Sequence, residues 1–308
     1  MTTVYKPTPA VASFLARKHQ LLIGGEWLEA CSEKRIEVLN PADKKVISTV
    51  AEGASIDVDR AVEAARAAFD SGSWSDIAAA QRTKILWRWA DLIEQNADQL
   101  VELEVLDNGM PMTLARGFLG HGVGWIRYYA GMCDKITGKN LSDIISSSDA
   151  RFHAYTQLKP IGIAALILPW NGPIGLFLIK TSPALAAGCA CVVKPAENTP
   201  LTALRLAELA LEAGIPEGIL NVVTGFAAAG EALAHHPCVD KISFTGSTAV
   251  GKQIIRAASG NLKRVTLELG GKSPCIIFDD ADLDEAIPAA AMAIFLNSGQ
   301  VCFAGSRL

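Results

Sequence analysis

Three side chains stand at places in the sequence where they could act together on a carbonyl group. Cys302 lies between Gly299 and Gly305, Glu268 precedes a glycine pair, and Asn171 lies in a short segment rich in proline and glycine. A thiolate can attack a carbonyl carbon, an amide can stabilise the resulting alkoxide, and a carboxylate can activate water against a thioester. A lone cysteine is more often a small buried apolar residue, so this chemistry requires all three groups to meet.

Other loops of the same kind carry groups that suit a nucleotide. Gly246 and Ser247 stand where an apolar run turns into a helical one, so backbone N–H groups and the helix dipole could hold a pyrophosphate. The spacing to Gly251 is not the usual dinucleotide fingerprint, and a glycine turn with a serine N-cap explains the same residues. Glu197 could accept bonds from ribose hydroxyls and Lys194 could donate, although the two could equally form a solvated pair.

The elements that must position these loops alternate between strand and helix from residue 161 onward. The predicted strands are 161–168, 190–194, 219–223, 241–244 and 265–269, and the predicted helices are 174–187, 201–213, 228–235 and 247–258. This order gives parallel strands joined by crossover helices. We therefore predict an α/β fold with an open, doubly wound parallel sheet that binds ligands at the carboxyl ends of its strands.

The flanking segments carry weaker patterns. Residues 58–69 and 85–93 have the apolar spacing of scaffold helices, and residues 151–158 alternate as a half-buried or paired strand does. Residues 274–278 read as another strand, before a helix that begins at the acidic residue Asp282. This last part predicts the start of a second domain, and because too little chain follows to build a core, we expect the chain to be truncated.

Composition excludes several classes of protein. Half of the 308 residues are hydrophobic, 19% are charged and the net charge is −4, so we expect a globular protein without affinity for nucleic acid or an anionic membrane. The uncharged stretch 161–179 has the length of a membrane span, but Pro169 and Pro173 would break a helix at its centre. The terminal segment 1–19 lacks the pattern of a signal peptide, so we expect a cytoplasmic protein. The seven scattered cysteines favour neither disulfides nor a metal site.

Together these motifs resemble the aldehyde dehydrogenase superfamily. They occur in the family's order, as Pro169 to Asn171, Lys194 to Glu197, Phe244 to Ser247, Glu268 to Lys272 and Gly299 to Cys302. The resemblance runs from about Leu21, through 40–42 and 106–109, to the last residue. Five such matches in register do not arise by chance.

The resemblance implies a role for each site residue. Cys302 would be the nucleophile, Asn171 and the Cys302 backbone N–H would form the oxyanion hole, and Glu268 would activate the deacylating water. Lys180 stands where the family keeps a lysine near the proton path of Glu268, although a lysine in a helix is usually a surface residue. The implied cofactor-binding residues are Leu168, Pro169, Trp170, Lys194, Glu197, Gly225, Gly246, Ser247, Leu269 and Gly270, with no metal.

The resemblance also implies an activity, a domain plan and partners. The activity is oxidation of an aldehyde to a carboxylic acid with NAD(P)+ through a cysteine thiohemiacetal and a thioester. NAD is favoured over NADP because Glu197 would repel a 2′-phosphate, although Lys194 beside it weakens this inference. The plan is a Rossmann-type NAD(P)-binding domain at 1–138 and 160–270, an oligomerisation arm at 139–159 and the start of an α/β catalytic domain at 271–308. We expect a homodimer or homotetramer, although the segment 139–159 could instead be an ordinary linker hairpin.

Two alternatives and one departure accompany this interpretation. An enzyme that transfers the acyl group to coenzyme A would share the fold, but Glu268 counts against it because such enzymes tend to lack a water-activating base. A truncated, inactive NAD-binding relative is the second alternative. Ala227 stands where the family commonly has a second glycine, which weakens the prediction for nearby Gly225. The predicted walls of the substrate site are mostly apolar, which favours a hydrophobic or aromatic aldehyde. These wall residues are Gly172, Ile179, Phe295, Val301 and Phe303.

Overall fold

The computed structural model describes residues 5–308, apart from the side chain of Asp143. Residues 1–4 lie outside the described residues. They belong to the first predicted domain and to the segment 1–19. The centre of the molecule is a seven-stranded sheet in the order β10-β9-β6-β7-β8-β2-β3. Its strands are β2 (Leu21–Ile23), β3 (Glu26–Leu28), β6 (Ile163–Ile167), β7 (Ala190–Lys194), β8 (Leu220–Val222), β9 (Lys241–Gly246) and β10 (Arg264–Leu269).

The predicted parallel sheet is confirmed for five of these strands. β10, β9, β6, β7 and β8 pair in parallel, whereas the hairpin β2-β3 joins the β8 edge antiparallel and was not predicted. The chain runs outward from β6 to β7 and β8, then crosses back to place β9 on the other side of β6. The strand order therefore reverses between β6 and β9, where a doubly wound sheet forms its ligand crevice.

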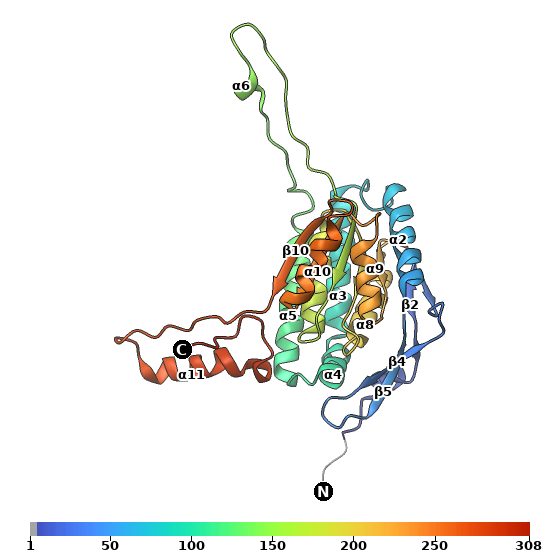
Figure 1. Ribbon diagram of the computed structural model, residues 1–308, viewed down its shortest axis with the longest axis vertical. Coiled ribbons are helices and arrows are strands. Elements are labelled where there is room, and N and C mark those ends of the chain that lie inside the picture. The colour runs from blue at the N-terminus through green and yellow to red at the C-terminus, as the bar shows by residue number, and fades with distance from the viewer. Residues whose placement is uncertain (1–4) are drawn as a thin grey trace.

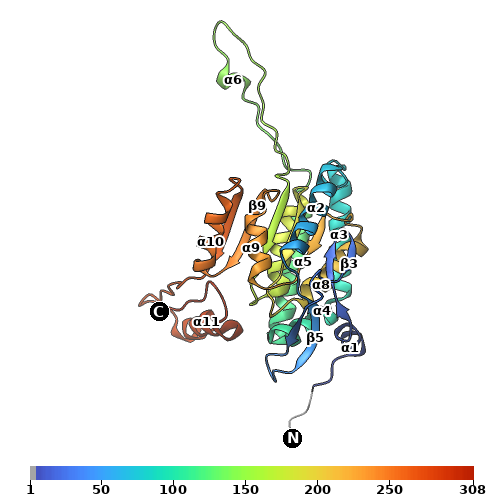
Figure 2. The same cartoon turned by 45° about the vertical axis from the view of Figure 1, so that its right-hand side comes forward.

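Helices cover both faces of the sheet (Figure 1). One layer contains α3 (Ala79–Gln95), α4 (Ala97–Asn108), α5 (Met112–Ala130), α7 (Pro173–Ala186) and α8 (Leu201–Ala213), which contact one another. The other contains α2 (Ser55–Asp70), α9 (Ala227–His235) and α10 (Thr248–Ala258). Figure 2 shows α10 beside α9, and α9 also contacts α2. The predicted crossover helices and the two scaffold helices are thus confirmed.

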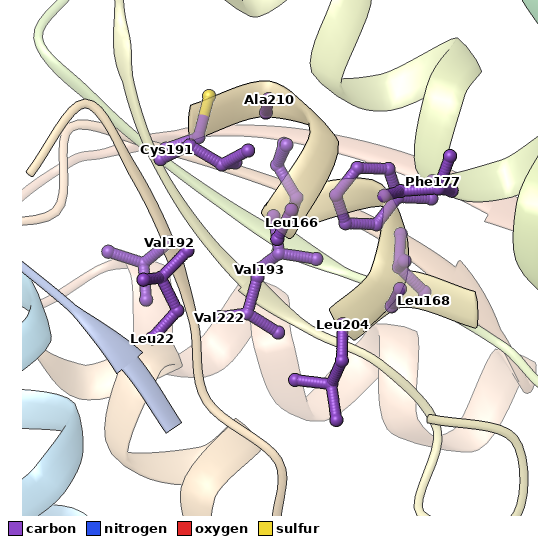
Figure 3. Packing of buried hydrophobic residues seen from close by; sticks show 14 of the residues in the cluster. Leu22, Leu166, Leu168, Phe177, Cys191, Val192, Val193, Leu204, Ala210 and Val222 are labelled. Atoms are coloured by element: carbon purple, nitrogen blue, oxygen red, sulfur yellow. The ribbon is translucent and has the colours of Figure 1, made fainter. Parts of the chain in front are cut away.

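The core sits where the central strands meet the helices. All five residues of β6 and all five of β7 are buried, as expected for continuous apolar strands covered on both faces. Figure 3 shows Leu166 and Val193 of these strands near Phe177 of α7 and Leu204 of α8. The apolar stretch 161–179 divides into β6, a loop and the start of α7. Within residues 5–308, no helix has both the length and the apolar character needed to cross a membrane.

A smaller sheet and a short helix complete the N-terminal part of the described chain. The sheet has the order β1-β5-β4, formed by β1 (Lys18–His19), β4 (Arg35–Leu39) and β5 (Val46–Ala51). The helix α1 (Pro9–Leu15) precedes it, and Glu102 of α4 accepts bonds from the Thr8 backbone N–H at 2.7 Å and the Thr8 hydroxyl at 2.6 Å. These contacts attach the first described residues to the helical layer.

Two predicted strands are wrong. Residues 151–158 form one side of a long projecting hairpin with α6 (Ser142–Ile145) near its tip, and their only ladder contact is an isolated bridge between Asn140 and Tyr155 (Figure 1). Residues 274–278 likewise make only a bridge from Pro274 to Arg307. An alternating pattern becomes a strand only beside another strand. Within the described chain neither segment has one.

The helix predicted after Asp282 is confirmed as α11 (Leu283–Phe295), where the Asp282 carboxylate accepts a 2.9 Å bond from the Asp284 N–H. A short 3₁₀ turn, η1 (Leu296–Gly299), follows. Both views show α11 standing away from the main body, to which the chain returns at η1 (Figures 1 and 2).

Candidate active site

A cavity of about 840 Å³ opens at the carboxyl ends of β6, β7 and β9, at the point where the strand order reverses. Its volume lies within the range of small-molecule sites. The predicted cofactor-binding residues that line it are Leu168, Pro169, Trp170, Lys194, Glu197, Gly246 and Ser247. Three loops that are far apart in the sequence therefore contribute to one cleft.

Lys194 and Glu197 face each other inside this cleft. The Lys194 side chain is only 6% exposed, and its Nζ lies 3.5 Å from Glu197 Oε2 and donates a 3.1 Å bond to the Pro195 carbonyl. Burial lowers the pKa of Lys194, while the nearby Glu197 carboxylate acts in the opposite direction. Lys194 therefore does not belong to a solvent-exposed ion pair with Glu197. Its buried side chain lines the cavity instead.

Gly246 and Ser247 form the turn from β9 into α10. A Cβ atom built on Gly246 would lie 2.5 Å from Cζ of Phe244, so a side chain there would displace a buried ring. The Ser247 hydroxyl accepts a 3.3 Å bond from the Val250 N–H, which confirms the N-cap interpretation. The same turn lines the cavity. It places the positive end of the α10 dipole there, where an anion is stabilised.

Three predicted cofactor residues lie outside this cavity: Gly225, Leu269 and Gly270. A Cβ atom on Gly225 would lie 2.5 Å from the Gly53 carbonyl, so close packing of two backbone segments explains this glycine. Leu269 packs against Gly251 of α10, with its Cδ2 3.0 Å from a Cβ built there. A cofactor role for these three residues stays a prediction.

The structure adds lining residues that the sequence interpretation missed. They come from α9 and α10, which are predicted only as crossover helices, and include His235, Gln253 and Arg256. A signal was present, because Val250, Gln253, Ile254 and Ala257 form one stripe of α10 and all line the cavity. A polar residue inside an otherwise apolar stripe was the sign that this face meets a ligand cleft.

The loop that carries Cys302 is attached to the loop that carries Asn171. The Asn171 amide donates a 2.8 Å bond to the Gln300 carbonyl, and the Asn297 amide donates a 3.0 Å bond back to the Asn171 carbonyl. Asn297, at φ 48°, is followed by Ser298 and Gly299, so three successive residues are left-handed. Strained backbone of this kind persists only where its surroundings hold it, and it concentrates at functional sites.

Cys302 is exposed, and its backbone also approaches the loop after Glu268. A Cβ atom built on Gly271 would lie 3.5 Å from the Cys302 carbonyl oxygen. Glu268 itself lies on the exposed face of β10, three residues before Gly271. The loops bearing the predicted nucleophile, amide and carboxylate therefore converge at one edge of the sheet, beside the cavity.

Lys180 is a buried residue of α7. Most helical lysines reach the surface, but Lys180 is only 8% exposed between α7 and β9, and its Nζ donates a 2.7 Å bond to the Ser243 hydroxyl. Its predicted catalytic role stays a prediction. Burial lowers the pKa of Lys180 to about 8, while the negative charge of Glu268 acts in the opposite direction. The lysine is therefore electrostatically coupled to the predicted base.

A second hollow of about 390 Å³ adjoins the nucleophile loop, between the start of α5 and the end of α11. Its lining is mostly apolar and consists of Pro111, Thr113, Leu114, Met292, Phe295, Leu296 and Asn297. Phe295 is the one predicted substrate wall that borders it. The hollow and the larger cavity share no lining residue.

Comparison with known proteins gives the same assignment. The family model described as "Aldehyde dehydrogenase family" matches residues 27–308. The chain is 49% identical to an aldehyde dehydrogenase of Tanacetum cinerariifolium over 94% of its length, and 48% identical to a phenylacetaldehyde dehydrogenase of Pseudomonas fluorescens over 99%. It spans 58% and 61% of the lengths of these two relatives.

Solved structures agree with the sequence comparison. The NAD+ complex of an aldehyde dehydrogenase from Bacillus cereus superposes with a TM-score of 0.94 at 44% identity, covering 99% of this chain and 61% of that one. The resemblance stated from the motifs is thereby confirmed, together with the fold class. The chain belongs to the aldehyde dehydrogenase family.

Proposed function

We propose that the protein containing this chain oxidises aldehydes to carboxylic acids with NAD+. The observation that carries this proposal is that the Cys302 loop contacts the loops of Asn171 and Glu268, next to Trp170, which lines the 840 Å³ cleft. A nucleophile beside a nucleotide-sized cleft suits a reaction in which an aldehyde forms a covalent adduct that then gives up a hydride. The relatives' names and the NAD+ in the Bacillus cereus structure support the same reaction.

The residues of the large cleft fit a dinucleotide. The Gly246–Ser247 turn offers backbone donors at a helix N-terminus to a pyrophosphate, and the Lys194–Glu197 pair offers a donor and an acceptor to ribose hydroxyls. The Glu197 carboxylate would repel a 2′-phosphate, which favours NAD over NADP. When bound, NAD+ supplies the acceptor for the hydride.

The first half of the proposed reaction belongs to Cys302 and Asn171. The Cys302 thiolate attacks the aldehyde carbon and forms a thiohemiacetal, whose oxygen carries the developing negative charge. An amide nitrogen has two N–H groups, and only one Asn171 N–H is directed to the Gln300 carbonyl. The second N–H, together with the Cys302 backbone N–H, would stabilise that oxygen. Loss of hydride then leaves a thioester on Cys302.

The second half belongs to Glu268. Its carboxylate would take a proton from water, which attacks the thioester and releases the carboxylic acid and the free thiol. We propose that Lys180 assists by stabilising the negative charge of Glu268 and by passing on the proton that Glu268 takes from water. Burial lowers the pKa of Lys180 to about 8, which suits it to proton transfer. Transfer of the acyl group to coenzyme A is disfavoured by the presence of this carboxylate.

The smaller hollow would receive the organic part of the aldehyde. Leu114, Met292 and Phe295 make its wall apolar, which supports a hydrophobic or aromatic substrate.

We further propose the domain plan predicted from the sequence, with the projecting hairpin 139–159 acting as an oligomerisation arm in a dimer or tetramer. The exposed side chains of Phe152, Tyr155 and Leu158 support that role. A cytoplasmic location is part of the same proposal.

An aldehyde panel assayed by NADH absorbance tests the proposed activity. The wild-type protein should reduce NAD+ with aliphatic or aromatic aldehydes, and Cys302→Ala should show no turnover because the nucleophile is lost. Cys238→Ala is the matched control, since Cys238 is also exposed but lies before β9, away from the cleft. Turnover by Cys302→Ala would refute the proposal, whereas acyl-coenzyme A as the obligatory product would replace it with the transfer reaction.

A further inference from the structure

The C-terminal end of α4 contacts the backbone on both sides of Asn171. On one side, the Asn108 amide donates a 2.6 Å bond to the carbonyl of Trp170. On the other side, Glu104 Oε1 accepts a 3.4 Å bond from the N–H of Ile174, in the first turn of α7. The segment that presents Asn171 is therefore held by two side chains that lie one helical turn apart on α4.

These contacts come from a part of α4 that cannot easily move. Glu104 is completely buried, and Asp107 beside it is 2% exposed and accepts a 2.9 Å bond from the N–H of Leu201, at the start of α8. Two neighbouring carboxyl groups thus hold the first turns of two crossover helices. Gly109 ends α4 in a left-handed conformation, and a Cβ atom there would lie 2.9 Å from Cγ of Pro41.

Stability of the fold alone does not account for the Asn108 contact. Asn108 is only half-buried, and its Oδ1 has no partner among the described residues, so the side chain makes one bond and that bond goes to the residue before Asn171. That oxygen is buried, and a buried polar atom without a partner costs stability, so a side chain placed only to stabilise the fold would satisfy both of its ends. The side chain is placed to fix one carbonyl.

We propose that Asn108 is a positioning residue for the oxyanion-stabilising amide: with Glu104 on the far side, it fixes the Trp170–Ile174 backbone so that an Asn171 N–H points toward the oxygen of the carbonyl group that Cys302 attacks. This inference rests on the proposed function. Asn108 touches neither the substrate nor the nucleophile in this account, and it acts only through Asn171.

Hydrogen exchange tests the positioning without requiring activity. In Asn108→Ala, the backbone N–H groups of residues 170–172 and 174 should exchange several times faster than in the wild type, because the Trp170 carbonyl loses its anchor. The control is Asn261→Ala, which removes an amide that also donates to backbone carbonyls, those of Pro237 and Val239, outside the site. Unchanged exchange at 170–172 and 174 in Asn108→Ala would overturn the inference, even if the protein oxidises aldehydes.

A double-mutant cycle then tests whether Asn108 acts through Asn171. Asn108→Ala should lower kcat by about tenfold or more, since a displacement of about 1 Å can cost up to about a hundredfold, and should change the Kd for NAD+ much less, because only Trp170 of the anchored segment lines the cleft. In the Asn171→Ala background the same substitution should have little further effect on kcat, because its target is already gone. Equal losses in both backgrounds, or an unchanged kcat, would contradict the inference.

Glu104 provides the second variant. Glu104→Gln keeps a carbonyl oxygen that accepts from the Ile174 N–H, so it should retain kcat within about twofold of the wild type. Glu104→Leu removes the acceptor and should lower kcat toward the value of Asn108→Ala. If Glu104→Leu is folded by circular dichroism and as active as Glu104→Gln, the acceptor is not needed and this half of the inference fails.

Discussion

The two halves of the site are held in different ways. The loops of the cofactor cleft follow β6 and β7, in which every residue is buried, and they are fixed by the same packing that forms the core. In residues 270–308, all of which the structure describes, only Asn297 and Ala304 are buried. The Cys302 loop takes its place from a few hydrogen bonds to the cleft, chiefly those of Asn171 and Asn297.

This difference shows where the chemistry is vulnerable. A cleft supported by a core tolerates the loss of one surface contact, because many buried neighbours still define its shape. A loop supported by individual hydrogen bonds depends on each of them. Asn171 belongs to both halves: its segment starts α7 in the core layer, and its side chain bonds to the nucleophile loop.

Asn171→Ala should therefore have a large effect on kcat. It removes the proposed oxyanion donor and also the bond to the Gln300 carbonyl, so kcat should fall by about 10²- to 10³-fold. Stopped-flow NADH formation measures the step directly. Binding of NAD+, followed by tryptophan fluorescence, should change little because the cleft is held by the core. A loss of NAD+ affinity as large as the loss of kcat would show that the two halves are not independent.

The buried carboxyl of Glu104 makes the core-supported half sensitive to pH. Burial raises its pKa from 4.5 to about 8, so the wild type loses stability as pH rises through that window, while the unfolded state ionises and the folded state stays protonated. Glu104→Gln lacks this group. By pH 8 its free energy of unfolding should exceed that of the wild type by about 2 to 4 kcal/mol, and near pH 4.5 the two should agree.

Urea denaturation at several pH values measures this difference. Burial and the charge of Glu104 also raise the pKa of Asp107, so the measured difference includes the effect of the substitution on Asp107. A constant difference between the two proteins from pH 4.5 to 8 would mean that Glu104 does not titrate in this window.

Gly246→Ala tests the cleft by steric means. The new Cβ would meet the Phe244 ring at 2.5 Å, so we expect a stability loss of about 1 to 3 kcal/mol and weaker binding of NAD+. Calorimetry gives both quantities. Gly260→Ala is the matched control, because a Cβ there meets nothing closer than 3.5 Å. Wild-type NAD+ affinity in Gly246→Ala would remove this turn from the proposed pyrophosphate site.

Lys180→Met should have a selective effect on the pH dependence of stability. The pKa of Lys180 is lowered to about 8, so the cost of burying its charge is present at pH 7 and is relieved as pH rises through about 8 toward 10.5. The stability advantage of the variant over the wild type should therefore shrink between pH 7 and 10. Chemical denaturation at these pH values measures it, and an advantage that grows with pH would reverse the assigned sign.

Much of this architecture can be predicted from the sequence, for reasons visible in particular elements. The strand at 190–194 and the helix at 201–213 are predicted to the residue, because an unbroken apolar run between turn residues has one stable outcome. The segments 151–158 and 274–278 fail because pairing, and not pattern alone, makes a strand. Asn108 and Asn297 escape prediction because a bond from a side chain to a remote backbone leaves no periodic trace.

In the proposed reaction, Cys302 carries the acyl group between oxidation of the aldehyde and hydrolysis of the thioester. The most direct test is mass spectrometry of the Cys302 peptide after a Glu268→Gln variant is mixed with an aldehyde and NAD+. An acyl adduct should accumulate on Cys302, with one NADH formed per adduct, because water is no longer activated. NADH formation with an unmodified Cys302, or an adduct on another residue, would contradict this role of Cys302.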